Sequence, residues 1–287
     1  MDALTILMTH IGDCTMLSKT FSLKDKVAIV TGAGRGIGRG IALALAEAGS
    51  NIAAVARTET EIEEVAREAR QMGRSGIAYP TDVTKPDDVD EMVEKVIADF
   101  GKIDILVNNA GTGLHKPVVP VDAFKIRWKD EGEVDPSTRT SDDEWNRIIG
   151  LNLTSAFYCV RAVGPHMIRQ KKGKVINISS FVGGKGVAYN LSYASSKAAL
   201  IMFTRSLALE WARYNINVNG IGPGFIHTVL TAHMFEDDNF KKRLLDSIPL
   251  KRAGTPEEVG ILAVYLSSDA SNYITGQTIF IDGGMVA

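Results

Sequence analysis

The feature that most constrains the fold is an alternation of short β-branched runs with helical segments along almost the whole chain. Apolar runs lie at 27–31, 51–55, 77–81 and 105–107 in the first half, and helical patterns separate them. Further runs lie at 174–178, 216–219 and 278–281, each preceded by a long helical segment. Strands that alternate with helices form parallel sheets covered on both faces. The sequence therefore predicts an α/β fold with a single doubly wound domain and a parallel seven-stranded sheet.

Three helix starts carry their own capping chemistry. Each begins with Ser or Thr and has Glu three residues later, at Thr58, Ser141 and Thr255. The hydroxyl and the glutamate of such a pair can satisfy free amides at the start of a helix. We therefore expect capping boxes at all three positions.

Two segments depart from this regularity. Residues 1–20 lack the basic start and continuous apolar run of a secretory signal, so we expect a loosely ordered N-terminal tail. We also hypothesise that translation begins at Met16, which would make residues 1–15 dispensable. Residues of about 112–140 are rich in charge, Pro and Gly and exceed an ordinary connection, which indicates a functional or mobile insertion. No linker divides the remainder, so one domain is expected over 21–287.

Composition excludes several classes of function. The formal charge of −2 and the pI near 6.2 lack the excess of basic residues that nucleic-acid-binding proteins use, so no nucleic-acid partner is expected. No apolar run approaches the roughly 20 residues that span a bilayer, so no membrane-embedded protein is expected. Cys14 and Cys159 are too few for a disulfide framework or a zinc site, which favours a cytoplasmic location. The five histidines are scattered, and no metal site is predicted.

A glycine-rich segment links the first strand to the first long helix. It reads Thr31-Gly-Ala-Gly-Arg-Gly-Ile-Gly38, which is T-G-x-x-x-G-x-G and not the strict G-x-G-x-x-G. Glycines in this setting let backbone amides approach a pyrophosphate at the helix N-terminus. The segment therefore predicts a dinucleotide site, and the alternative is a merely flexible turn.

The end of the second strand indicates which dinucleotide fits. NAD-specific sites place an acid about 20 residues after the glycine loop to hold the ribose 2′-hydroxyl. Ala56 occupies that position here, and Arg57 follows it while Arg35 lies in the glycine loop. Two guanidiniums can bind a 2′-phosphate. NADP(H) is therefore predicted over NAD(H), unless both arginines are only solvated surface residues.

Tyr193 and Lys197 lie four residues apart, which places a phenol and an ammonium on one face of a helix. A tyrosine with a reference pKa of about 10 needs a shift of roughly three units, or about 4 kcal/mol, to act as a base near pH 7. A cation about 4 Å away supplies about 4 kcal/mol at an effective dielectric near 20. The spacing is sufficient for a tuned acid/base, although the same pair can also be an aromatic ring beside a solvated lysine.

Together these motifs resemble the short-chain dehydrogenase/reductase family. The glycine loop, Asn108-Asn-Ala-Gly111, Asn152, Ser180, Tyr193-x-x-x-Lys197 and Pro223-Gly224 occur in the family's order across about residues 24–284. The resemblance implies a Rossmann-type domain and a cofactor held at the strand ends. Cofactor contacts are expected from Gly32, Arg35, Gly36, Ile37, Gly38, Arg57, Asp82, Val83, Asn109, Ala110, Gly111, Tyr193, Lys197, Pro223, Gly224, Ile226 and Thr228. Asn108 would support the cofactor near its ribose.

The resemblance also implies four catalytic roles. Tyr193 is the general acid in reduction and the base in oxidation, while Lys197 lowers its pKa and holds the nicotinamide ribose. Ser180, thirteen residues before Tyr193, binds the substrate oxygen, and Ser179 is the less favoured candidate. Asn152 anchors a water that links Lys197 to solvent, or alternatively satisfies helix backbone.

Substrate selection is expected from about 225–250 and from residues beside the catalytic serine and tyrosine. Phe181, Gly183, Tyr189 and His227 are candidates to line the pocket, although each could lie in the core or on the surface. The basic run 241–243 could receive an acidic carrier or a phosphate, or be solvated. The insertion, which makes the stretch from Gly111 to Trp145 about twenty residues longer than the family pattern, is expected to form a lid in preference to a subunit contact.

The function predicted from these residues is NADP(H)-dependent interconversion of a ketone or aldehyde with an alcohol. A 3-oxoacyl thioester and a sugar or polyol remain equal candidates for the small-molecule substrate. Two other classes are a non-catalytic dinucleotide sensor or scaffold and a methyltransferase, against which the complete Asn, Ser, Tyr and Lys set argues. The resemblance also implies a homotetramer or a dimer.

Overall fold

A computed structural model describes residues 15–121, 138–228, 231–232 and 237–287. Within them, seven parallel strands form one sheet in the order β3-β2-β1-β4-β5-β6-β7. The strands are β1 (Val27–Thr31), β2 (Asn51–Ala56), β3 (Gly76–Pro80), β4 (Ile105–Asn108), β5 (Gly173–Ile178), β6 (Ile216–Pro223) and β7 (Thr278–Ile281). The doubly wound sheet predicted from the alternation is confirmed.

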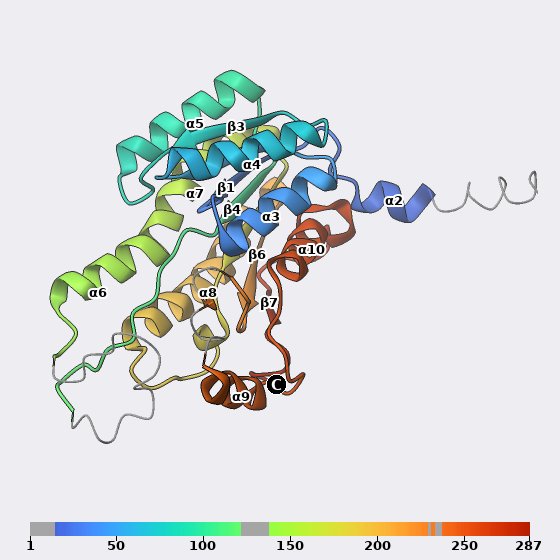
Figure 1. The fold of residues 1–287 in the computed structure, drawn as a ribbon. Helices are drawn as coiled ribbons and strands as arrows, with labels where there is room; N and C mark the ends of the chain where they lie inside the picture. Colours follow the sequence, from blue (N-terminus) through green and yellow to red (C-terminus); the bar gives the residue numbers. More distant parts are fainter. Residues whose placement is uncertain (1–14, 122–137, 229–230, 233–236) are drawn as a thin grey trace, which may run out of the picture.

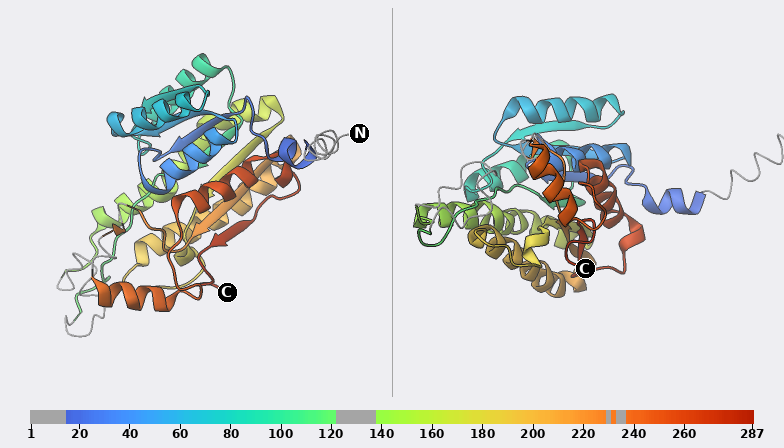
Figure 2. Two further views of the ribbon diagram at one scale, coloured as in Figure 1. Left: turned by 45° about the vertical axis from the view of Figure 1, so that its right-hand side comes forward. Right: turned by 60° about the horizontal axis from the view of Figure 1, so that its bottom comes forward.

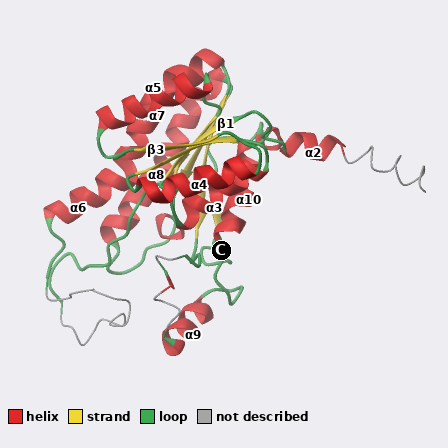
Figure 3. Ribbon diagram, turned by 45° about the horizontal axis from the view of Figure 1, so that its top comes forward, coloured by secondary structure: helices red, strands yellow, loops and turns green. Residues whose placement is uncertain are grey.

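Helices cover both faces of this sheet (Figures 1 and 3). They are α2 (Thr15–Phe21), α3 (Gly36–Glu47), α4 (Glu59–Gln71), α5 (Pro86–Phe100), α6 (Asp142–Ile149), α7 (Ser155–Gln170), α8 (Leu191–Trp211), α9 (Asp238–Ser247) and α10 (Pro256–Ser267). Shorter turns are η3 (Gly150–Thr154), η4 (Phe181–Gly183), η5 (Ala212–Tyr214) and η7 (Asp269–Ser271). α3, α4 and α10 pack on one face, and α5, α7 and α8 pack on the other.

The two faces of β1 show why its residues form a central strand. Ala28 and Val30 join the cluster that α3 and α10 cover, whereas Val27 and Ile29 join the cluster that α5 and α7 cover. Side chains alternate between faces along a strand, and a parallel strand is buried on both. Every residue of β1 is accordingly buried.

The order of strands fixes where a ligand can bind. β1 pairs with β2 on one side and with β4 on the other, so the direction of winding reverses between β1 and β4. In open α/β sheets the crevice for ligands lies outside the carboxyl ends of the strands at this reversal. The glycine loop follows β1 at that point.

The structure describes the N-terminal segment, where a loosely ordered tail is expected over 1–20, only from Thr15 onward. Thr15–Phe21 forms helix α2, which projects from the layered body (Figure 2). The ring of Phe21 lies 6.0 Å from that of Tyr265 on α10, and this apolar contact explains why the end of the segment is held. Residues 1–14 lie outside the described residues.

Two of the three expected capping boxes are confirmed. Ser141 and Thr255 each accept from the amide of the glutamate three residues on, and each glutamate accepts in return from the cap amide. The prediction for Thr58 is wrong, because its side chain makes no capping bond. Glu61 turns instead toward the glycine loop, where its carboxylate lies 3.8 Å from Arg35.

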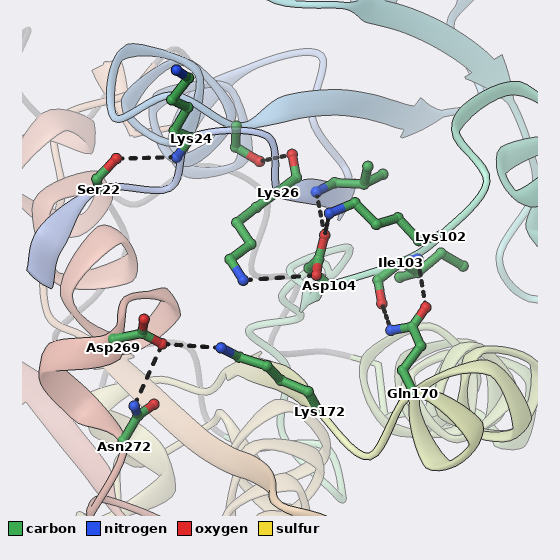
Figure 4. Close-up of polar contacts among 12 residues, drawn as sticks. Ser22, Lys24, Lys26, Lys102, Ile103, Asp104, Gln170, Lys172, Asp269 and Asn272 are labelled. Carbon is green, nitrogen blue, oxygen red and sulfur yellow. Dashed lines mark hydrogen bonds and ion pairs between the residues drawn. The ribbon is translucent and has the colours of Figure 1, made fainter. Parts of the chain in front are cut away.

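A polar network ties together the amino ends of the strands, opposite to the ligand crevice (Figure 4). Asp104, just before β4, accepts from the Val27 amide at 2.9 Å and from Lys102 Nζ at 2.9 Å, and Lys26 Nζ lies 3.9 Å away. Lys172 pairs with Asp269 at 3.4 Å across the edge of β5. The Lys174 amide of β5 donates to the Asp104 carbonyl at 2.9 Å, so Asp104 joins the starts of β1, β4 and β5.

Of the helices among the described residues, none is both long and apolar enough to cross a membrane. Cys159 is a free thiol buried in the cluster between the sheet and α5 and α7, as its apolar setting predicts, and burial raises its pKa to about 12.

Candidate active site

The glycine loop forms a cradle that only glycines can line. Gly32 and Gly36 have φ of +64° and +56°, in the left-handed region. A Cβ at Gly38 would lie 2.1 Å from the Gly32 carbonyl oxygen. Arg35 is the N-cap of α3 and makes no side-chain capping bond, so the first amides of the helix remain available to an anion. The cradle fits a dinucleotide pyrophosphate.

Thr31 and Asn109 hold this loop against the end of β4. Thr31 Oγ1 accepts from the amides of Asn109 and Ala110, each at 3.0 Å. The Asn109 side-chain nitrogen donates to the carbonyls of Thr31 at 2.9 Å and Gly32 at 3.2 Å. Both the backbone amide and the side-chain amide of Asn109 therefore hydrogen-bond to the glycine loop or to Thr31 at its start. In a cofactor site these bonds would hold the loop in position. Thr31 was not singled out from the sequence, although it opens the motif.

The predicted selector of the 2′-phosphate lies at the ends of β2 and β3. β2 ends at Ala56, and Arg57 follows it as an exposed side chain. Arg57 lies close enough to Asp82 to contribute to its pKa. Burial raises that pKa, but two hydrogen bonds from Thr84 and the charge of Arg57 outweigh burial and lower it overall. The site presents two arginines, Arg57 and Arg35, at the edge of the cradle, with Glu61 beside Arg35.

Tyr193, Lys197 and Ser180 come together where α8 begins and β5 ends. Ser180 is 6% exposed, and hydrogen bonding from its side chain acts to lower the pKa of Tyr193. Lys197 is 4% exposed, and its Nζ donates to the Ile178 carbonyl at 2.8 Å and lies 5.8 Å from the centre of the Tyr193 ring. Ser179 Oγ donates to the Lys197 carbonyl at 2.9 Å, so its hydroxyl serves the backbone of α8.

The pKa of Tyr193 differs from the expectation of a phenol tuned downward. Burial raises it and outweighs the opposing hydrogen bond from Ser180. Burial also lowers the pKa of Lys197 to about 8, because a charged ammonium is costly where water is excluded. Burial therefore shifts the pKa of each group more than the charge of the other group does.

Asn152 connects the loop after β4 to α8. It lies in the single π-helical turn η3 among the described helices, and such turns often mark functional sites. Its Oδ1 accepts from the Thr112 amide at 2.8 Å, and its Nδ2 donates to the Thr112 carbonyl at 2.9 Å and to Ser196 Oγ at 3.0 Å. A Cβ at Gly111 would lie 3.1 Å from Asn152 Oδ1 and 3.3 Å from Lys197 Nζ, so these groups share one small space.

The segment after β6 closes the other side of the glycine loop. A Cβ at Gly36 would lie 3.5 Å from the Thr228 methyl group. Thr231, which the sequence did not mark, accepts from the Thr228 amide at 2.9 Å and donates to the Ile226 carbonyl at 2.7 Å. Pro223 ends β6, and a Cβ at Gly224 would meet Asp282 at 2.6 Å. Four predicted cofactor residues are apolar and pack into or against the core clusters: Ile37, Val83, Ala110 and Ile226.

The four candidate substrate residues lie in η4, just before α8 and in the segment after β6. Phe181 is buried and its ring lies 5.4 Å from that of Phe225, so it joins η4 to the segment after β6. Tyr189 has φ of +61°, and its carbonyl accepts from the Lys116 amide at 2.7 Å. A Cβ at Gly183 would lie 2.9 Å from the Lys197 carbonyl carbon, which shows how tightly η4 packs on α8. His227 donates its amide to the Gly254 carbonyl at 2.9 Å.

Two further sequence predictions concern surfaces. Residues 122–137, and with them the lid expected from the insertion, lie outside the described residues. Lys241 and Lys242 border an open hollow of about 580 Å³ on α9, but Asp238 and Asp246 border it as well. Lys251 borders it too, so three lysines and two aspartates face this hollow. The described residues contain no cluster of three or more His, Cys, Asp or Glu side chains that could hold a metal.

The chain is similar in fold and in sequence to known proteins. The family model described as enoyl-(acyl carrier protein) reductase matches residues 32–286. The chain is 39% identical over 262 residues to a 3-oxoacyl-(acyl-carrier-protein) reductase of Staphylococcus epidermidis, which covers 91% of this chain and 99% of that protein. It is 37% identical over 270 residues to the 5-keto-D-gluconate 5-reductase of Escherichia coli, covering 94% and 99%. The chain belongs to the short-chain dehydrogenase/reductase family.

A solved structure supports the cofactor class. It is a protein of Beutenbergia cavernae assigned as an NAD(P)-dependent gluconate 5-dehydrogenase, with NADP bound at low occupancy. It superposes with a TM-score of 0.79 at 34% identity, over 93% of this chain and 99% of that one. As a member of this family, the chain is an oxidoreductase that transfers hydride between a nicotinamide dinucleotide and a carbonyl or alcohol substrate.

Proposed function

We propose that this chain reduces a ketone with NADPH through Ser180, Tyr193, Lys197 and Asn152. The observation that carries the proposal is the buried Lys197, whose Nζ donates to the Ile178 carbonyl, two residues before Ser180, and lies 5.8 Å from the centre of the Tyr193 ring. Two hydroxyls at one point can hold a carbonyl oxygen and stabilise the negative charge that develops on it. Bound NADPH supplies the hydride, while the protein supplies position and electrostatics.

The raised pKa of Tyr193 suits the reductive direction. A phenol that keeps its proton at neutral pH is ready to give it to the substrate oxygen as that oxygen gains charge. Ser180 holds the same oxygen in place. Lys197 lies near the tyrosine ring, where its ammonium stabilises the phenolate left after proton transfer and holds the cofactor ribose. Asn152 holds the loop after β4 near Lys197 and anchors the water that returns the proton.

The enzymatic function is tested by oxidation of NADPH against a panel of ketones. The panel contains an acetoacetyl thioester, 5-keto-D-gluconate, diketones and bulky ketones, and consumption of NADPH is followed by absorbance. We expect turnover with at least one ketone. A chain that binds NADPH tightly but consumes it with no member of the panel would instead be a dinucleotide sensor or scaffold.

The choice of NADP(H) over NAD(H) is proposed from Arg57 and Arg35. A hydrogen bond to a charged group contributes about 1.5–3 kcal/mol, so Arg57→Asp is expected to lower the ratio of kcat/KM for NADPH to that for NADH by about 10- to 100-fold. The new carboxylate repels a 2′-phosphate and can accept from a 2′-hydroxyl. Steady-state kinetics with both cofactors measure the ratio.

Arg67→Asp is the matched control, because it makes the same charge change further along α4, where Arg67 is paired with Glu64. It should leave the ratio unaltered. Wild-type preference for NADH would show that both arginines are only surface residues.

Assembly as a homotetramer or a dimer is also proposed. Large apolar side chains are exposed on α7 and α8, including Phe157 at 45%, Met202 at 56% and Leu209 at 83%. Exposed apolar surface of this kind often marks contacts between proteins. The cytoplasmic location stays a prediction.

A further inference from the structure

Two polar side chains beside Tyr193 have no role in hydride transfer. His115 lies in the segment after β4, and Asn190 is the N-cap of α8. Asn190 Nδ2 lies 3.2 Å from His115 Nε2. Asn190 is 4% exposed, and its Oδ1 has no hydrogen-bond partner among the described residues. Neither residue was marked from the sequence, since each is a single polar residue outside any motif.

A buried amide oxygen without a partner is uncommon in folded proteins. Leaving such a group unsatisfied costs about 1–3 kcal/mol, so the great majority are hydrogen-bonded. Rotating the Asn190 amide by half a turn does not remove the cost, because the nitrogen would then lack a partner in place of the oxygen. The site therefore retains an unused hydrogen-bonding atom in either orientation.

The protonation state of His115 determines which hydrogen bonds His115 and Asn190 can make with a ligand. Burial lowers its pKa, so the imidazole is neutral at neutral pH. With Asn190 Nδ2 donating to Nε2, the ring proton resides on Nδ1. The pair then provides an acceptor, Asn190 Oδ1, and a donor, His115 Nδ1. A hydroxyl group, which both donates and accepts, is the complement of such a pair.

The pair lies on the same wall as the catalytic groups. Asn190 and Tyr193 are three residues apart at the start of α8, so they share one face. The segment from Gly111, close to Lys197, runs outward to His115. It is held by the bond from Thr112 to Asn152 in η3 and by the bond from Lys116 to Tyr189, just before α8. His115 and Asn190 thus lie about one helical turn N-terminal of Tyr193.

We propose that His115 and Asn190 form a subsite that binds a hydroxyl group adjacent to the reacting carbonyl, so that the substrate is a hydroxylated ketone such as a keto-polyol or a keto-sugar acid. This inference rests on the proposed ketone reduction. An apolar acyl chain at the same position would leave the buried oxygen of Asn190 unsatisfied, so a 3-oxoacyl thioester is disfavoured.

Wild-type kinetics with three matched ketones test the subsite without any mutation. They are 3-hydroxybutan-2-one, butan-2-one and 3-methoxybutan-2-one, measured at saturating NADPH. The methoxy compound keeps the electron withdrawal of the hydroxyl but cannot donate to Asn190. A hydrogen bond to a buried polar group corresponds to about 10- to 100-fold, so kcat/KM for the hydroxy ketone should exceed both others by that factor.

Equal kcat/KM values for the hydroxy and methoxy ketones would overturn the subsite while leaving ketone reduction intact. Failure of every ketone in this set and in the panel above would overturn the proposed function itself. The two failures are therefore distinguishable.

Asn190→Leu provides a second test, because leucine has a similar shape and no polar atoms. It should remove the preference for the hydroxy ketone, measured as the ratio of its kcat/KM to that of butan-2-one, and leave the dissociation constant of NADPH near wild type. Asn146→Leu is the matched control, on an exposed position of α6. A preserved preference in a folded Asn190→Leu protein would contradict the proposal. If that variant does not fold, the wild-type comparison decides.

Discussion

Tyr193→Phe is expected to lower kcat for ketone reduction by about 100- to 10,000-fold, the usual contribution of a positioned general acid. The variant keeps the aromatic ring and the packing of α8 but removes the proton that the substrate oxygen must receive. It also removes the hydroxyl whose pKa hydrogen bonding from Ser180 acts to lower. Because NADPH binds mainly at the glycine loop, its dissociation constant should change little. Single-turnover oxidation of NADPH and fluorescence titration separate the two effects.

Tyr265→Phe is the matched control for this change. Tyr265 lies on α10 and packs against Phe21 of α2, remote from the site, so its variant should retain wild-type kcat. Near-normal turnover of Tyr193→Phe would remove this residue from the mechanism. Loss of both turnover and NADPH binding would assign Tyr193 to cofactor binding alone.

The second large effect is a decline of kcat/KM for NADPH above pH about 8, the pKa of Lys197. Below this pH the buried amine is a cation that can bind the ribose and attract the anionic cofactor, and above it the charge is lost. Because kcat/KM reports ionisations of the free enzyme, its pH profile shows the change directly. Lys197→Met should lower kcat/KM at pH 7 and abolish the decline.

Lys174→Met is a matched control, since burial also lowers the pKa of Lys174 to about 8 but this residue lies at the amino edge of the sheet. It should preserve the decline. A profile that stays flat to pH 10 in the wild type would contradict the role of Lys197.

The same ionisation predicts the direction of a stability change. The folded chain binds the proton of Lys197 less tightly than the unfolded chain, whose lysines have a pKa of about 10.4. The free energy of unfolding contributed by this group therefore rises as pH increases from about 8 toward 10.4.

The sheet could be predicted from sequence because both of its physical signals are local. β-branched runs mark buried parallel strands, and the glycine spacing identifies the turn between β1 and α3. Strand bounds differ from the predicted ones mainly at β6, which extends to Pro223. The capping box at Thr58 was wrong because Glu61 has a competing cation, Arg35, from a distant part of the chain.

The proximity of Lys197 to Tyr193 could be predicted from the sequence, whereas the electrostatics of the two groups could not. Four-residue spacing places Lys197 beside Tyr193, yet it contains no information on how much water the fold removes from either group. Burial, which depends on the packing of η4 and α8, reverses the expected direction of the Tyr193 pKa. The pairing of Asn190 with His115 could not be predicted from the sequence either, because it joins segments 75 residues apart.

The amino-edge network around Asp104 has a consequence for how this enzyme can diversify. Its bonds among the starts of β1, β4 and β5 stand at the end of the sheet opposite to Ser180 and Tyr193. Loops at the carboxyl edge can therefore be exchanged or lengthened without touching these anchors. Laboratory evolution can therefore seek new substrates with libraries of variants confined to the loops at the carboxyl edge. The bonds at the amino edge then keep the sheet intact.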